Sequence, residues 1–197
     1  MPESITKSKI TIANNLLLGL IILVNGYVIM APLWPTLAYQ ANNHTAKRQQ
    51  LKASLRAPTP TAQPNHLVVP SMLLDEPVYE GPARDQYKIL NKGIWRYDRG
   101  STPDQGGNTV LIGHRFTYTT PRGVFYHLDK VSVGDEIGLW WNNKRYLYKV
   151  SQVKTVAPTD TAIENNTSDP QLTIFTCTPL WLPKNRLAVI ARLEASS

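Results

Sequence analysis

The distribution of apolar and charged residues divides the chain into an apolar N-terminal part, a short polar part and a long region of brief apolar runs. No Asp, Glu, Lys or Arg occurs between positions 10 and 46, and residues 16–30 are densely apolar. As a helix, residues 10–33 would extend about 36 Å, enough to cross a hydrocarbon core of about 30 Å. Trp34 and Tyr39 then follow, as is typical of a membrane interface. The pattern predicts a transmembrane anchor at residues 10–33.

Two other interpretations of this segment are a cleaved signal peptide and a buried core helix. The run is long for the apolar centre of a signal peptide, and no convincing small-residue cleavage site follows it, so we favour the anchor. Lys7 and Lys9 favour a cytoplasmic N-terminus at residues 1–9. Because the basic residues of 47–56 lie on the other side but farther away, charge alone favours this orientation only slightly.

The segment at residues 34–65 separates the anchor from the rest of the chain. Residues 41–57 contain good helix formers with little apolar face, which predicts a solvated helical stalk. Pro58, Pro60 and Pro64 then predict an extended linker. We therefore place a domain boundary at this linker, with the folded domain at residues 66–197.

From residue 66 onward the pattern is that of β-strands bounded by Pro and Gly. The runs lie at residues 67–69, 77–79, 110–112, 137–141, 146–153, 172–176 and 187–190. A short helix is predicted at 83–91, ended by Gly93. Seven or eight short strands without a long helix predict an all-β fold, a closed β-barrel.

The clearest hairpin has its turn at Asn142 and Asn143. Trp140 and Trp141 precede this turn, and neighbours on a strand point to opposite faces. We therefore expect one of these indoles in the core and the other exposed.

Composition narrows the class of function. The 197 residues carry a net charge of +7 and a pI of about 9.5, which suits anionic surroundings such as nucleic acid, acidic lipid or a cell wall. The basic residues are scattered and match no nucleic-acid motif, so no nucleic-acid partner is predicted. A single cysteine excludes an internal disulfide and the multi-cysteine zinc patterns. No nucleotide-binding motif or metal-ligand spacing is present, so no cofactor or metal is predicted.

The chemistry-bearing candidates lie at the ends of predicted strands. Most free cysteines are buried and act as small apolar side chains. Cys177 instead ends the run 172–176, and this position favours a functional role. His114 ends another run, which favours it over His44, His66 and His127 as a partner for the thiol. Arg186 opens the next strand after a proline-bounded loop, and its fork of donors suits a developing oxyanion.

These segments resemble a known family. Leu172-Thr-Ile-Phe-Thr-Cys177-Thr-Pro resembles the Thr-Leu-x-Thr-Cys signature of sortases, and Asn185-Arg186-Leu187 resembles the strand that carries their active-site arginine. Residues 107–115 resemble the segment with their catalytic histidine. Residues 69–81 and 125–137 are similar to flanking parts of the barrel. The resemblance covers residues 66–193 and is closer to pilin-type and related sortases than to the housekeeping type.

The resemblance implies an eight-stranded β-barrel cysteine transpeptidase on the outer face of a bacterial membrane, with its N-terminus inside. Sortases cleave a C-terminal sorting motif, typically Leu-Pro-x-Thr-Gly, in secreted proteins. They transfer the acyl group to an amine of a cell-wall precursor or of a pilin lysine.

In this interpretation Cys177 is the nucleophile, His114 the general acid and Arg186 the oxyanion ligand. We further expect Thr176, Thr178 and Trp181 to contact the substrate. Two alternatives remain: a cysteine hydrolase that releases the acyl group to water, and a catalytically idle, membrane-tethered binding barrel.

Overall fold

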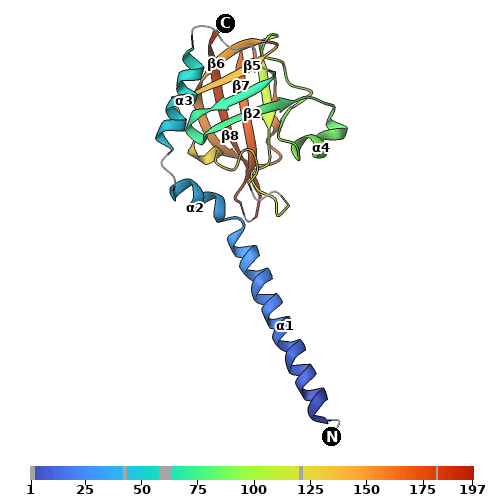
Figure 1. The fold of residues 1–197 in the computed structure, drawn as a ribbon. Helices are drawn as coiled ribbons and strands as arrows, with labels where there is room; N and C mark the ends of the chain where they lie inside the picture. Colours follow the sequence, from blue (N-terminus) through green and yellow to red (C-terminus); the bar gives the residue numbers. More distant parts are fainter. Residues whose placement is uncertain (1–2, 42–43, 58–63, 120–121, 181) are drawn as a thin grey trace.

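A computed structural model describes residues 3–41, 44–57, 64–119, 122–180 and 182–197. Figure 1 shows a β-barrel preceded by helices, the first of which extends away from the barrel. These helices are α1 (Glu3–Met30), α2 (Trp34–Ala41) and α3 (Thr45–Arg56). The predicted linker falls largely at residues 58–63, outside the described residues, and the domain boundary there stays a prediction.

Eight strands close the barrel in the order β1-β2-β3-β4-β7-β8-β6-β5, which confirms the predicted fold. Their bounds are β1 His66–Val69, β2 Leu74–Tyr79, β3 Ile94–Arg96, β4 Asn108–Ile112, β5 Glu136–Trp141, β6 Lys144–Val156, β7 Gln171–Thr178 and β8 Asn185–Ser196. Only β3 was not predicted, because three residues are too few to show an alternating pattern.

Short helical turns connect the strands. They are η1 (Pro70–Met72), η2 (Ala83–Asp85), α4 (Gln86–Leu90), η3 (Leu128–Lys130) and η4 (Thr161–Glu164). The helix predicted at 83–91 corresponds to η2 and α4, which project from one side of the barrel in Figure 1.

The barrel core is built by alternate residues of the strands. On β7, Leu172 and Ile174 enter the main core, while Phe175 packs with Val110 and Ala188 in a second apolar cluster on the other face. Cys177 therefore shares the face of Phe175. Most strand pairs are antiparallel, but β2 runs parallel to β3, and β4 runs parallel to β7. Their carboxyl ends consequently meet at one edge of the barrel.

Helix α3 packs against the barrel instead of standing free in solvent as a stalk. Leu51 and Leu55 are only 5% and 1% exposed, and they form a cluster with Val68 and Trp140. The two leucines are four residues apart and so share one helix face, which is enough to attach a short helix. Trp140 is buried under this helix and Trp141 in the barrel core, so the expectation that one indole is exposed was wrong.

The predicted turn between β5 and β6 is confirmed. Asn142 and Asn143 have φ values of +49° and +62°, and Trp141 pairs with Lys144 across them. Two successive left-handed residues are the requirement of the tight hairpin turn, and asparagine tolerates that conformation better than most side chains.

One helix of the described chain, Lys9–Met30, is long and apolar enough to cross a membrane, by length and composition alone. The barrel contacts the end of this helix. Tyr27 donates a hydrogen bond to the carbonyl of Tyr118 (2.9 Å), and the hydroxyl of Tyr126 donates to the carbonyl of Pro32. The loop that follows β4 thus lies against the junction of α1 and α2.

Candidate active site

Strand pairing brings the three predicted site residues to the same edge of the barrel. Ile112 is opposite Phe175 in the parallel β4–β7 pair, and His114 and Cys177 each follow two residues later. Cys177 is directly opposite Arg186 in the antiparallel β7–β8 pair. All three line one cavity of about 450 Å³. The structure therefore unites residues that lie far apart in the sequence.

Hydrogen bonds fix the two parallel strand ends to each other. The hydroxyl of Thr176 donates to the carbonyl of Gly113 over 2.7 Å, and the amide of Gly113 donates to the carbonyl of Phe175 over 3.4 Å. A Cβ atom on Gly113 would lie 2.5 Å from Val124 and 2.7 Å from Phe125, so a larger residue does not fit. Thr176 lines the cavity but is buried, and its hydroxyl makes the hydrogen bond to Gly113 that joins the two strands.

The thiol of Cys177 is free and exposed. The commonest fate of a free cysteine, burial as a small apolar side chain, does not apply to it. An exposed thiol at the edge of a cavity is accessible to a substrate carbonyl.

His114 is half-buried at the end of β4. Burial lowers the pKa of its imidazole below the usual 6.5, because the protonated ring loses hydration. The neutral ring therefore predominates at neutral pH, and the imidazolium that could protonate a leaving amine is a minority species.

Arg186 is held by a carboxylate that the sequence analysis did not single out. Its Nη1 donates to Oε1 of Glu164 on η4, and its guanidinium lies 4.9 Å from the ring centre of Phe175. Glu164 also lines the cavity. No spacing rule links positions 164 and 186, so only the folded chain identifies this pair.

A second arginine lies next to the site. Arg115 donates through Nη1 to the hydroxyl of Thr178 over 2.7 Å, and its Nη2 lies 3.5 Å from Oδ1 of Asp129. Thr178 is thus tied to the loop that follows His114 and is not among the residues lining the cavity. Trp181, the third expected substrate contact, lies outside the described residues.

An apolar wall completes the cavity. It is formed by residues of α4, of β3 and the residue after it, and of β4, namely Tyr87, Leu90, Trp95, Tyr97 and Ile112. The Trp95 indole is fixed by a 3.0 Å hydrogen bond to the carbonyl of Gly81 and by an edge contact with Tyr97, 5.6 Å between centres. Such a surface suits apolar side chains of a bound peptide.

Comparison with known proteins gives consistent results. The family model described as "Sortase domain" matches residues 67–194. The chain is 31% identical over 115 residues to Sortase A of Staphylococcus aureus, covering 57% of this chain and 53% of that protein. It is 30% identical over 129 residues to Sortase D of Bacillus subtilis, covering 65% and 60%. The chain thus spans little more than half the length of these curated relatives.

Solved structures share the fold. Listeria monocytogenes sortase A superposes with a TM-score of 0.58 at 25% identity, covering 70% of this chain and 90% of that one. Streptococcus agalactiae Sortase C1 gives a TM-score of 0.58 at 29% identity, covering 66% of each chain.

Proposed function

Because the chain belongs to the sortase family, we propose that it is a membrane-anchored cysteine transpeptidase acting through Cys177, His114 and Arg186. The observation that carries this proposal is the arrangement at the barrel edge. An exposed thiol lies directly across the strand pair from a guanidinium, and a histidine ends the parallel neighbouring strand. A nucleophile, a proton donor and a cationic oxyanion ligand are the groups that acyl transfer requires.

The first half-reaction forms an acyl-enzyme. The Cys177 thiolate attacks the scissile carbonyl carbon, and the carbonyl oxygen becomes an oxyanion that the Arg186 guanidinium stabilises. When the C–N bond breaks, the imidazolium of His114 gives its proton to the departing amine. The result is a thioester on Cys177, a free amine product and a neutral imidazole.

The second half-reaction reverses these roles. Neutral His114 takes a proton from the incoming amine, which attacks the thioester carbon, and the Cys177 thiolate leaves. The new amide bond replaces the peptide bond that was cleaved, so no oxidant, metal or nucleotide is consumed.

Glu164 has a positioning role in this scheme. Its carboxylate accepts a hydrogen bond from Nη1 of Arg186, which leaves the other guanidinium N–H groups available to the substrate. The ring of Phe175 supports the same guanidinium from β7. The oxyanion ligand is therefore oriented before the substrate arrives, which lowers the cost of reorganisation.

We propose that residues 1–9 are cytoplasmic and that the barrel lies outside the membrane crossed by residues 10–33. The apolar helix Lys9–Met30 supports the span, and Lys7 and Lys9 favour a cytoplasmic N-terminus. The candidate site would then face secreted proteins that carry a C-terminal sorting motif of the Leu-Pro-x-Thr-Gly kind. The acceptor would be an amine of a cell-wall precursor or of a pilin lysine.

The sub-type is a separate prediction. The similar proteins named above are sortases of types A, C and D, so they do not separate the pilin-type interpretation from others. The acceptor amine, once identified, would decide between cell-wall attachment and pilus assembly.

The test is a mass-spectrometric assay on the full chain in membranes, with a library of sorting peptides and candidate amines. We expect a thioester on Cys177, and an amide product that grows at the expense of free acid when amine is added. Cys177→Ala should abolish both while the barrel stays folded. Free acid alone would favour the hydrolase alternative. Failure of a thiol-reactive substrate analogue to label Cys177 would favour the idle binding barrel.

A further inference from the structure

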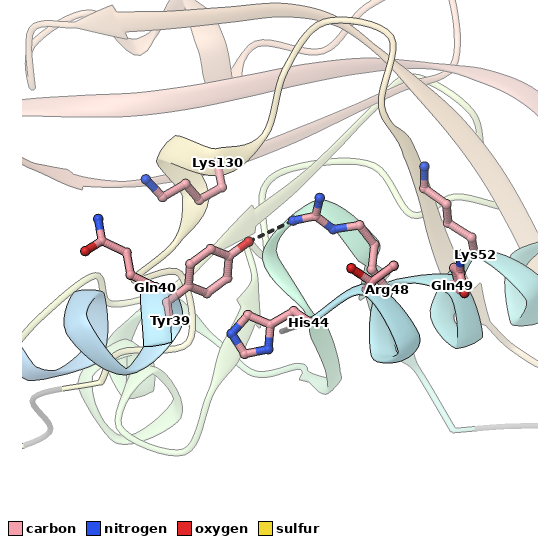
Figure 2. A pocket seen from close by; sticks show the side chains of 8 residues that line it. Tyr39, Gln40, His44, Arg48, Gln49, Lys52 and Lys130 are labelled. Atoms are coloured by element: carbon pink, nitrogen blue, oxygen red, sulfur yellow. Dashed lines mark hydrogen bonds between the residues drawn. The ribbon is translucent and has the colours of Figure 1, made fainter. Parts of the chain in front are cut away.

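A second cavity lies on the side of the barrel that the N-terminal helices cover, away from the cavity of Cys177. Its volume is about 660 Å³. The residues lining it are Tyr39, Gln40, His44, Thr45, Arg48, Gln49, Lys52 and Lys130. Figure 2 shows that they come from α2, α3, the residue before α3, and η3 of the barrel. We call this cavity the basic pocket.

The lining of the basic pocket is positively charged. Arg48, Lys52 and Lys130 contribute cationic groups, and none of the described residues that line it carries a carboxylate. Lys130 lies 3.6 Å from Asp129, but neither Arg48 nor Lys52 has a carboxylate partner within the described parts of the chain. The pocket therefore has an excess of positive charge that suits an anion.

Arg48 is held in place by uncharged groups only. Its Nη2 donates to the Tyr39 hydroxyl over 2.9 Å, drawn as the dashed line in Figure 2, and to the carbonyl of Ser71 over 3.3 Å. Its buried Nε atom and the buried Nε2 atom of His44 have no hydrogen-bond partner among the described residues. Buried polar atoms without partners are uncommon and costly, so Arg48 and His44 keep unmet hydrogen-bonding capacity beside the pocket.

The position of the basic pocket points to a membrane lipid as the source of the anion. Helix α2 directly follows the apolar helix α1 and supplies Tyr39 to the pocket. Its side chains Trp34 and Leu37 are 66% and 47% exposed, which suits the boundary between acyl chains and headgroups. Free inorganic phosphate could bind the cationic side chains of the pocket, but it would not contact the apolar surface of Trp34 and Leu37.

We propose that the basic pocket binds the phosphate headgroup of an anionic phospholipid from the membrane that holds α1. The phosphate contacts Arg48, Lys52 and Lys130, while the apolar part of the lipid lies along Trp34 and Leu37. Binding joins α2, α3 and η3 through one ligand and so fixes the orientation of the barrel over the membrane. This inference rests on the membrane anchoring proposed above, but not on the transpeptidase chemistry.

The experiment uses the full chain in nanodiscs of phosphatidylcholine, with or without phosphatidylglycerol. Native mass spectrometry measures the lipids retained, and thermal unfolding measures the stabilisation of the barrel. We expect preferential retention of phosphatidylglycerol and a higher Tm in its presence, because a ligand that binds only the folded state stabilises it.

Three variants locate the binding. Lys52→Gln and Lys130→Gln should each weaken phosphatidylglycerol retention about fivefold, the usual effect of one basic residue near an anionic membrane surface. Both side chains are exposed, so these changes should leave the fold intact. Arg48→Gln should weaken retention at least as much. The matched control is Lys144→Gln, an exposed lysine at the β5–β6 turn, which should retain the lipid like the wild type.

Three results with protein that has entered nanodiscs would overturn the proposal. These are equal retention of the two lipids, an equal loss in Lys144→Gln and Lys52→Gln, and an equal rise in Tm when inorganic phosphate is added to phosphatidylcholine nanodiscs. The last result would mean that the pocket takes a free anion. Cys177→Ala should lose activity but retain the lipid, which separates this test from that of the proposed chemistry. Protein that does not enter nanodiscs at all would refute the anchor and this proposal together.

Discussion

At the scale of single residues, the protonation of His114 governs the expected rate. The proposed first step needs a thiolate and an imidazolium together. Because burial lowers the pKa of the His114 imidazole below its usual 6.5, the imidazolium is scarce at neutral pH. A slow enzyme follows from this arrangement.

The same protonation argument predicts the pH profile. We expect a bell-shaped dependence of kcat/KM whose acidic limb lies below pH 6.5, because the lower apparent pKa is that of the buried His114. Steady-state rates with a sorting peptide across the pH range measure it. An acidic limb above pH 7 would contradict the role of burial at this ring.

The Glu164–Arg186 pair gives a second prediction. Glu164→Gln keeps the shape of the side chain but removes its charge, so the guanidinium is held less firmly. We expect kcat to fall about tenfold, the effect of losing one charge-assisted hydrogen bond, with a smaller change in KM. Glu194→Gln is the matched control, because Glu194 pairs with Lys149 on an exposed part of the barrel. Equal losses in both variants would mean a general effect on stability.

The geometry of Arg186 gives a third prediction. Arg186→Lys preserves the charge but lacks the planar fork that contacts Glu164 and leaves further donors for the oxyanion. We expect most of the rate to be lost while the pH profile keeps its shape. Single-turnover formation of the acyl-enzyme is the appropriate measurement. Full activity of the lysine variant would show that a point charge suffices.

At the scale of elements, helix α3 belongs to the packed structure of the barrel. Leu55→Ala should lower the free energy of unfolding by about 3 kcal/mol, because it leaves a cavity above Val68 and Trp140. Chemical denaturation measures the change. Gln50→Ala, at an exposed position of the same helix, should change stability by less than about 0.5 kcal/mol. Equal stability of the two variants would mean that α3 does not contribute to folding.

The strands of the barrel were predictable where the apolar run is long or is bounded by residues typical of turns. Residues 172–176 form a short, largely apolar run that ends at Cys177, and Asn142 and Asn143 mark a hairpin by their tolerance of positive φ. β3 escaped prediction because it has three residues. The packing of α3 against the barrel was not predicted, because two leucines alone form only a small apolar face. The folded barrel provides Val68 and Trp140, against which these leucines pack.

The candidate site was predictable only in part. Cys177, His114 and Arg186 each occupy a strand end that the sequence marks, and a family resemblance adds to this pattern. Glu164 was not predictable, because its contact with Arg186 depends on how η4 folds over the β7–β8 pair. The apolar wall at Tyr87 was not predicted, because its residues come from separate segments around α4, β3 and β4 that meet only in the folded chain.

At the scale of the whole molecule, His127 connects the N-terminal helices with the barrel. Its ring is buried and lies 4.4 Å from that of Tyr39 on α2 and 4.9 Å from that of Tyr126. Burial, together with the positive charge of Arg122, lowers its pKa from 6.5 to about 4. The folded protein therefore resists protonation at this contact.

This shift predicts a loss of stability in mild acid. A histidine with a lowered folded-state pKa contributes stability that is complete above pH 6.5 and is lost as the pH falls toward 4. The total is about 3 kcal/mol, because each pH unit between 6.5 and about 4 is worth about 1.36 kcal/mol. His114 acts in the same direction. Denaturation at pH 7 and pH 5 should show a smaller acid effect in His127→Gln than in the wild type. An identical acid effect would contradict this account.

The parallel pairing of β4 and β7 has a consequence for how the protein matures. The hydrogen bond between Thr176 and Gly113 joins residues 63 apart in the sequence. Contacts of such separation form late in folding, because the intervening chain must first be ordered. A newly made chain therefore has a thiol but no neighbouring imidazole until its barrel closes. If the proposed function is correct, incompletely folded molecules should not cleave peptides, and the appearance of cleavage activity should report the end of folding.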